Sequence, residues 1–278
     1  MAVFLSLVAA VVFGTGDFFG GLAAKRAAVL YVVAGSHVVG LLGVTATALV
    51  VADRFRIEDF LLGAAGGILG GLGVALLYRG LARGPMSVVA PLTAITSAAV
   101  PAAWGVGSGD DLAVTAWLGV GLALVAIGLV SASREGAGTP VTPQVVVEAL
   151  AAGAGFGGFF IFLDATSDGS APWPVVGARV VTAALLVGFI VVTRRPVAAA
   201  VASAGWLIVA TGVLDTASNV VFLYATQRGL LTIVAVLTSL YPVSTVILAR
   251  VVLDERMSVA QLWGFVAAMA ATGLIAAG

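Results

Sequence analysis

The sequence predicts an all-α membrane protein with ten transmembrane helices, arranged as two inverted repeats of five helices each. Three observations lead to this fold class. The 278-residue chain is 61% hydrophobic and only 9% charged, whereas soluble domains carry about a quarter charged residues. Its apolar stretches have about the length that a bilayer core requires. The two halves of the chain also resemble each other in sequence.

The internal repeat is the most specific of these observations. Residues 82–131 align without a gap to residues 227–276. Most aligned positions differ, but the identical ones, such as Gly84 and Gly229, are spread along the whole length. A second match joins the segments 14–19 and 155–160, near the starts of the two halves. Duplicated membrane halves are typical of alternating-access transporters, whose binding site lies between the repeats near the middle of the bilayer.

Ten candidate spans follow from the interruptions of the apolar pattern at charged, glycine and proline clusters. A helix needs about 20 mostly apolar residues to cross roughly 30 Å of hydrocarbon. The candidates are residues 3–24, 29–51, 60–81, 86–107, 112–132, 145–166, 173–193, 205–226, 230–251 and 259–277. A count of nine would follow if one segment failed to insert, but the repeat favours five plus five.

In the first half, span one lacks a basic segment before it and a cleavage site after it, so we interpret it as a retained helix and not as a signal peptide. Span two ends before a charged loop, and span three is rich in glycine, which allows close helix packing. Span four contains Pro91 and Pro101, which remove helical hydrogen bonds. Span five ends before a Gly- and Pro-rich stretch that suits a linker.

In the second half, span six follows this linker and span seven begins at Trp173 and Pro174. Span eight carries polar residues at its middle. Span nine contains Tyr241 followed by Pro242, where a kink is expected. Span ten follows a short charged loop.

These elements divide the chain into a first repeat at 1–134, a linker at 135–143 and a second repeat at 144–278. Because five is odd, the second repeat must enter the membrane from the opposite face, so the repeats are inverted and both termini lie on one side. Loops after odd-numbered spans carry more basic residues, which would place these loops in the cytoplasm. Several of these arginines lie within helix ends, so the side of the termini stays open.

Composition excludes several classes of function. The net charge is zero, so no basic surface indicates a nucleic-acid partner. The chain has no cysteine and one histidine, which excludes thiolate metal sites, thiol catalysis and a His-pair metal site. No Gly-x-x-x-x-Gly-Lys-Ser/Thr run is present, so ATP does not power this chain directly. We therefore expect no metal, no cofactor and no catalytic residue.

Two carboxylates within the spans are candidate substrate or ion ligands, because a charge at the bilayer centre is costly. Asp17 lies inside span one and could bind a cation or carry a proton; alternatively, it pairs with Lys25 or Arg26. Asp215 lies in the middle of span eight, with Asn219 one turn later on the same face. Its alternative role is a clamp between helices.

His37 and Arg179 occupy equivalent positions in spans two and seven, because residues 33–39 align with residues 175–181. A symmetric pair of this kind could anchor a carboxylate or phosphate group, or could form structural ion pairs. Tyr78 and Tyr241 could contact a substrate or supply hydrogen bonds between helices. Asp215 could also pair with Arg179 or Tyr78.

The chain resembles the EamA type of the drug/metabolite transporter superfamily, which is built from two five-helix repeats. The second half carries the resemblance at Leu240–Pro242, at the charged loop 254–258, and at Gly264 and Gly273. Arg179 matches an arginine that is frequent early in span seven, whereas His37 departs from it. Residues 14–19 are similar to the first-helix motif of the family but lack its tryptophan.

The resemblance and the repeat together lead us to expect a secondary transporter, with export favoured, of a small metabolite, amino acid or drug-like solute. We expect a multi-pass protein of the bacterial inner membrane whose partners are this solute, the lipid bilayer and, as a hypothesis, protons. Two alternatives stay open. A lipid scramblase would need a polar groove open to lipid, and a membrane-embedded enzyme would need catalytic groups that the sequence does not offer.

Overall fold

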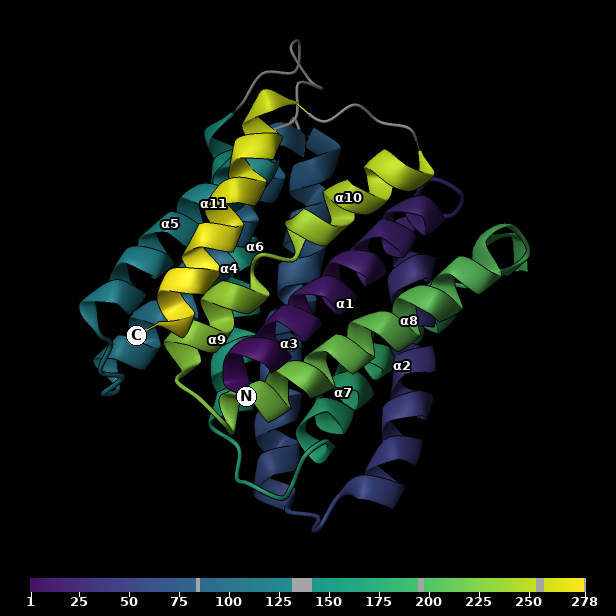
Figure 1. The fold of residues 1–278 in the computed structure, drawn as a ribbon. Coiled ribbons are helices and arrows are strands. Elements are labelled where there is room, and N and C mark those ends of the chain that lie inside the picture. The colour runs from purple at the N-terminus through teal and green to yellow at the C-terminus, as the bar shows by residue number, and fades with distance from the viewer. Residues whose placement is uncertain (84–85, 132–141, 195–197, 254–257, 278) are drawn as a thin grey trace.

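A computed structural model describes residues 1–83, 86–131, 142–194, 198–253 and 258–277, and within these ranges it consists of eleven helices without a strand (Figure 1). The helices of the first half are α1 (Ala2–Ala24), α2 (Val29–Val51), α3 (Ile57–Arg83), α4 (Met86–Gly107) and α5 (Val114–Ser131). Those of the second half are α6 (Pro143–Asp164), α7 (Trp173–Val192), α8 (Ala198–Thr226), α9 (Leu231–Thr238), α10 (Pro242–Val252) and α11 (Val259–Ala276). The expected linker lies almost wholly outside the described residues.

The bounds of these helices agree with the expected spans to within three residues, apart from the eighth and the ninth. The eighth begins earlier, at Ala198, and the ninth is divided into α9 and α10 by a turn at residues 239–241. The turn ends at Pro242, which has no N–H to donate and disfavours helical geometry in the residue before it. The two prolines of the fourth span do not interrupt α4. The repeat equivalent of Pro242 in α4 is Ser97, which can continue a helix.

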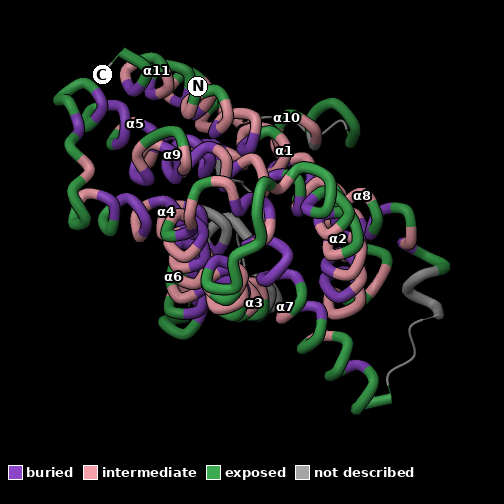
Figure 2. Tube along the Cα trace, turned by 90° about the horizontal axis from the view of Figure 1, so that it is seen from below, coloured by how far each residue is buried: buried purple, intermediate pink, exposed green. Residues whose placement is uncertain are grey.

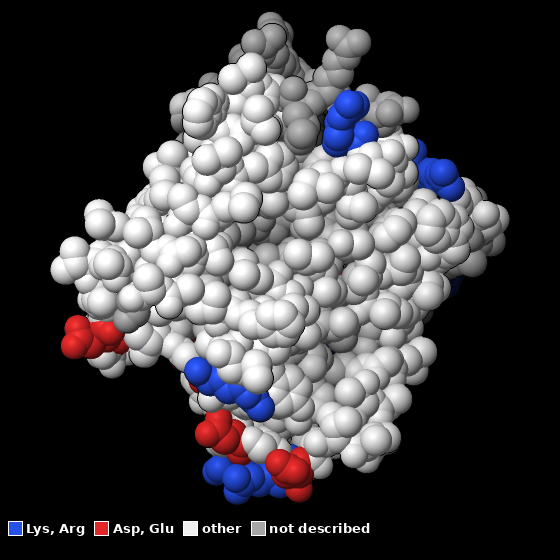
Figure 3. Space-filling view, viewed as in Figure 1, with Lys and Arg blue, Asp and Glu red and all other residues white. Residues whose placement is uncertain are grey.

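The described helices suit a membrane in length and composition. Eight candidate spans are long and apolar enough to cross it, with α9 and α10 counted as one, and two shorter apolar helices lie in α4 and α5. Large apolar side chains such as Leu42, Leu72, Trp206 and Met269 are exposed on the outside. In Figure 3 the charged side chains of the described residues lie toward the upper and lower ends of the visible face. The apolar belt between these ends fits a hydrocarbon environment.

The main helix contacts cross from one half of the chain to the other. Helix α1 packs against α8, α9 and α10, while α6 packs against α3 and α4. Helix α2 packs against α7 and α8, α3 against α7, α4 against α9, and α5 against α11. Figure 2 shows buried positions where these helices meet and exposed ones on the outer faces. The two halves therefore share their apolar cores.

Contacts at the helix ends define the directions of the helices. At one end, the Ser203 hydroxyl donates to the Arg26 carbonyl at 3.1 Å, which joins the end of α1 to the start of α8. At the other end, Gly229 lies beside Ala2, and the Gln227 amide donates to the Ser167 carbonyl at 3.4 Å. The end of α6 therefore lies beside the start of α1. The first helices of the two halves run in opposite directions.

Helices α3 and α7 cross at glycines, which allow the backbones of the two helices to come into direct contact. A Cβ atom at Gly177 would overlap the carbonyl oxygen of Phe60, and one at Gly67 would lie 2.6 Å from the Ala178 Cα. Backbone atoms inside two packed helices cannot move aside independently. Small residues of this kind allow helices in lipid to approach and gain van der Waals contact.

We therefore expect Gly177→Ala to destabilise the protein by about 1–3 kcal/mol, as overpacking of a tight contact does. Thermal unfolding of the detergent-solubilised protein measures the effect as a lower Tm. Gly188→Ala in the same helix is the matched control, because a Cβ atom there meets nothing within 4 Å. Equal Tm values for the two variants would contradict this account of the α3–α7 crossing.

Candidate functional site

A buried polar network joins α2, α7 and α8 between the two halves of the chain. Arg179 of α7 is 5% exposed and its guanidinium forms an ion pair with the carboxylate of Asp215 in α8. Its second terminal nitrogen lies 3.1 Å from Nε2 of His37 in α2. The Nδ1 atom of His37 lies 2.7 Å from the hydroxyl of Thr182, one turn after Arg179.

The hydrogen bonds of this network assign the tautomer of His37. The Thr182 hydroxyl donates to the carbonyl of Ala178 at 2.9 Å, so it accepts from the imidazole at Nδ1. Arginine can only donate, so Nε2 must accept from Arg179. The imidazole is therefore neutral, with its proton on Nδ1, and the positive charge of the network is carried by Arg179.

Two buried polar atoms of the network have no hydrogen-bond partner among the described residues. They are Nε of Arg179 and Oδ1 of Asn219. The amide nitrogen of Asn219, which is 3% exposed as a residue, donates to the backbone carbonyl of Asp215 at 2.7 Å. A buried polar atom without a partner costs about 1–3 kcal/mol, so these atoms are candidates for contact with a bound solute.

Asp17 of α1 faces space inside the bundle. It follows Ser6 by eleven residues and Ala10 by seven, so all three lie on one face of the helix. Ser6 and Ala10 are 0% and 5% exposed, yet Asp17 is exposed. The exposed apolar residues Phe4 and Val11 lie on a different face.

The backbone beside Asp17 packs closely on the second half of the chain. A Cβ atom at Gly16 would lie 3.3 Å from the backbone nitrogen of Asp215. The Asp17 and Asp215 carboxylates are near enough to repel each other, and Asp17 also interacts electrostatically with Tyr241. One turn later in α1, Gly21 is exposed and a Cβ atom there meets nothing within 4 Å. The accessible space therefore continues toward the C-terminal end of α1.

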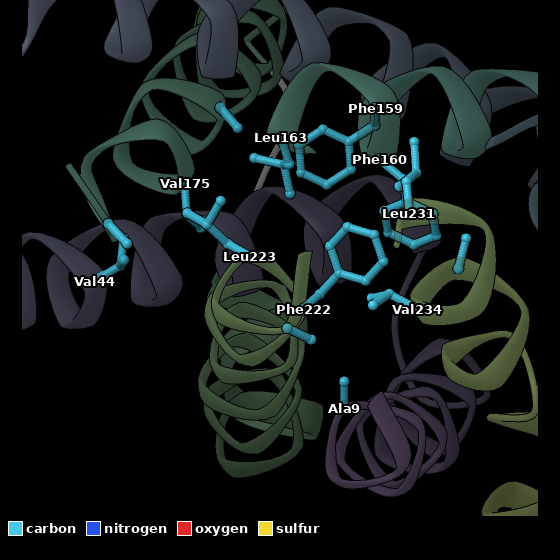
Figure 4. Packing of buried hydrophobic residues seen from close by; sticks show 14 of the residues in the cluster. Ala9, Val44, Phe159, Phe160, Leu163, Val175, Phe222, Leu223, Leu231 and Val234 are labelled. Atoms are coloured by element: carbon cyan, nitrogen blue, oxygen red, sulfur yellow. The ribbon is translucent and has the colours of Figure 1, made fainter. Parts of the chain in front are cut away.

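An aromatic cluster closes this space on the other side. The Phe13 ring, one turn before Asp17, lies 6.2 Å from the Phe160 ring and 6.5 Å from the Tyr241 ring, centroid to centroid. Phe160 stacks on Phe222 at 4.3 Å, and the two rings face each other in the apolar core (Figure 4). The cluster joins α1, α6, α8 and the turn before α10, so it connects both halves of the chain.

A cavity of about 270 Å³ lies at the end of the bundle that holds the start of α1. Its lining includes Asp53, Asp168, Tyr224 and Arg228, from the ends of α2 and α8 and the loop before α7. The aromatic cluster lies one turn before this end of α8, because Phe222 precedes Thr226 by four residues. The cluster therefore separates this outer cavity from the space beside Asp17.

Most of the residues that we singled out in the sequence come together. Asp17, Asp215 and Tyr241 interact, and the alternative clamp between Asp215 and Arg179 is present. No ion pair of Asp17, with Lys25 or otherwise, occurs among the described residues.

His37 and Arg179, which occupy equivalent positions in the sequence repeat, contact each other directly. Asn219 bonds to the Asp215 backbone and not to its carboxylate. Tyr78 lies in α3, but its side chain is outside the described residues.

Sequence reasoning missed Thr182 and the three phenylalanines of the cluster, Phe13, Phe160 and Phe222. The position of Thr182, three residues after Arg179 on one helical face, is a signal that could have identified it. Phe160 belongs to the segment 155–160, which repeats residues 14–19. Phenylalanine is too common in apolar helices to indicate a site by itself.

A profile of the EamA-like transporter family matches residues 145–277. The second half of this chain is therefore similar to the EamA-like transporter family. The resemblance to the drug/metabolite transporter superfamily is thereby confirmed, and the family indicates a transporter in general. A crystal structure titled only as that of a protein aligns with a TM-score of 0.81 and 18% identity, over 98% of this chain and 95% of its own. At this identity it supports the fold alone. No curated protein matches the chain in sequence.

The buried polar network of α2, α7 and α8 allows a stability test. We expect Arg179→Gln and Asp215→Asn to be coupled by about 1–3 kcal/mol in a double-mutant cycle, because each single variant leaves a buried group without its partner. Unfolding in detergent measures the coupling. The pair Arg56 and Glu58, 3.9 Å apart and with side chains 45% and 68% exposed, is the control, with expected coupling below about 1 kcal/mol. Equally weak coupling in both pairs would contradict a buried role for Arg179.

Proposed function

We propose that this chain is a secondary transporter that exports a small metabolite, amino acid or drug-like solute across the bacterial inner membrane by alternating access. In this proposal, ten membrane spans form two inverted repeats at residues 1–134 and 144–278, joined by a linker at 135–143. Asp17, His37, Tyr78, Arg179, Asp215, Asn219 and Tyr241 form the substrate or ion site. The family match of the second half supports transport as the general activity.

The symmetry of the helix contacts supports the inverted repeat. When the halves are exchanged, the contact of α1 with α8 becomes that of α6 with α3, and the contact of α2 with α8 becomes that of α7 with α3. The contacts α2–α7, α4–α9 and α5–α11 each map onto themselves. A two-fold axis that passes between the halves accounts for all of these pairs.

The observation that carries the proposal is the accessible Asp17 carboxylate beside the buried Arg179–Asp215 pair, between the halves. Asp17 lies 15 residues from the start of α1, or roughly 22 Å at 1.5 Å per residue, and Asp215 lies 11 residues from the end of α8, or roughly 16 Å. Asp215 therefore lies near the middle of a hydrocarbon core of roughly 30 Å, and Asp17 lies within it, roughly 10 Å from the end of α1. A charge at this depth is energetically costly, so a carboxylate that is kept there is a candidate for a functional role.

The arrangement around this site fits one state of an alternating-access cycle. The space beside Asp17 continues toward the C-terminal end of α1, while the aromatic cluster of Phe13, Phe160, Phe222 and Tyr241 blocks the path to the outer cavity. A solute could then enter from one side only. The interaction of Asp17 with Asp215 makes these two carboxylates the candidates for carrying a coupled proton.

The test is solute flux in proteoliposomes with an imposed pH gradient, using a labelled panel of amino acids, amines and sugars. We expect gradient-driven flux of at least one solute, reduced about tenfold or more by Asp17→Asn. Asp111→Asn is the control, because Asp111 is an exposed carboxylate in the loop before α5.

Solute flux that does not depend on the pH gradient, and that persists in both Asp17→Asn and Asp215→Asn, would overturn proton coupling. The absence of flux for every solute, with the variants and the parent folded equally well, would overturn transport. Lipid flipping between leaflets in the same vesicles would instead indicate a scramblase.

A further inference from the structure

The charges at the site do not balance. Arg179 contributes one positive charge, Asp215 contributes one negative charge and Asp17 contributes another when it is ionised, while the hydrogen bonds of His37 make its imidazole neutral. The positive charge of Arg179 is matched by Asp215. The Asp17 carboxylate therefore has no hydrogen bond or ion pair among the described residues. The neighbouring carboxylate of Asp215 repels it.

The groups that face Asp17 favour a ligand with a positive charge over one with a negative charge. Asp215 approaches from α8 and the Tyr241 hydroxyl from the turn before α10, while the Arg179 charge behind Asp215 is already paired. Among the described residues shown to face this site, a bound anion would meet two carboxylates, and the one cation, Arg179, is already paired. A cation would remove the net negative charge from an environment in which an unpaired charge is costly.

A second observation points to a ligand with N–H groups. The Oδ1 atom of Asn219 is a buried acceptor without a partner, one turn after Asp215 on the same face of α8. Helices α1 and α8 are antiparallel and Gly16 lies beside Asp215, so one turn along α8 brings Asn219 to about the level of Phe13. Asn219 can therefore accept from a donor that also reaches Asp17, one turn away in α1.

The walls of the site favour an organic ion over a metal ion. The Phe13 and Tyr241 rings, 6.5 Å apart between centroids, lie beside Asp17, and aromatic faces attract ammonium groups. Hard metal cations prefer several oxygen ligands, whereas no group of three acidic or histidine side chains converges anywhere in the described part of the chain.

We propose that the solute is a protonated organic amine with an apolar body, whose ammonium group binds the Asp17 carboxylate and donates to Oδ1 of Asn219 between the Phe13 and Tyr241 rings. This inference rests on the proposed transport function of the same site. It narrows the substrate class from small solutes in general to monovalent cations with N–H donors.

The test compares ligands that share one body and differ in charge. Phenethylamine, its N,N,N-trimethyl derivative, phenylalanine, 3-phenylpropionate and 2-phenylethanol are titrated against the purified protein, with binding followed by calorimetry. We expect phenethylamine to bind at least tenfold more tightly than the zwitterion, the anion and the alcohol. The trimethyl derivative should be weaker than phenethylamine, because it cannot donate to Asn219.

Variants assign the contacts. Asp17→Asn should weaken phenethylamine binding about tenfold or more, while Asp17→Glu, which keeps the charge, should restore most of it. Asn219→Leu should remove the preference for phenethylamine over its trimethyl derivative. The Tm of each variant without ligand shows whether it is folded, and Asp111→Asn should behave as the parent does.

Preferred binding of phenylalanine or 3-phenylpropionate, or amine binding that Asp17→Asn leaves unchanged, would overturn the inference. Flux measurements separate it from the proposed function. Transport of a zwitterion or anion would leave a transporter whose substrate is not an amine. Amine binding that depends on Asp17, without flux of any solute, would leave the binding site and overturn transport.

Discussion

The buried guanidinium of Arg179 is the constraint on which the centre of this bundle depends. A positive charge in an apolar interior must be matched by partners that come close enough to replace water. Asp215 supplies the counter-charge from α8, and His37 supplies a neutral acceptor from α2. Thr182 in turn fixes the tautomer of His37. One side chain thus ties α2, α7 and α8 together, and these helices come from both halves of the chain.

Because Arg179 uses its charge on Asp215, the third charged group of the site is the one that our proposal assigns to the solute. Asp17 has no ion pair among the residues that the structure describes, and it stands where the inner face of α1 becomes accessible. The aromatic cluster begins one turn away at Phe13 and is buried at Phe222, which is 0% exposed. A structural ion pair, an unpaired carboxylate and an apolar barrier therefore follow one another along the space between the halves.

The sequence was sufficient to predict the family, the helical class and most helix bounds, because long apolar stretches have few alternatives to helix in a membrane. It also named Asp17, Asp215 and Arg179 as candidates, since charges are rare within such stretches. The partners could not be chosen, because several pairings of Asp215 were compatible with its position. The helix contacts were equally hidden: most helices here are apolar all round, so no apolar stripe indicates which face meets a neighbour. Pro242 indicated a kink, but two prolines in α4 gave the same signal without a break.

The two halves of the chain share glycines that pack the helices but differ in the charged residues of the site. Asp17 of the first half aligns with Gly158 of the second, and His37 aligns with Arg179. When the gapless alignment of the repeats is extended toward the N-terminus, Asp215 aligns with Gly70. Glycines that bring backbones together can be kept in both copies, because both copies need the same packing. A symmetric copy of each charge would instead place two arginines or four carboxylates around one axis, and like charges in a low-dielectric interior repel strongly. An unbalanced site of one buried pair and one unpaired carboxylate therefore requires that the copies differ at these positions.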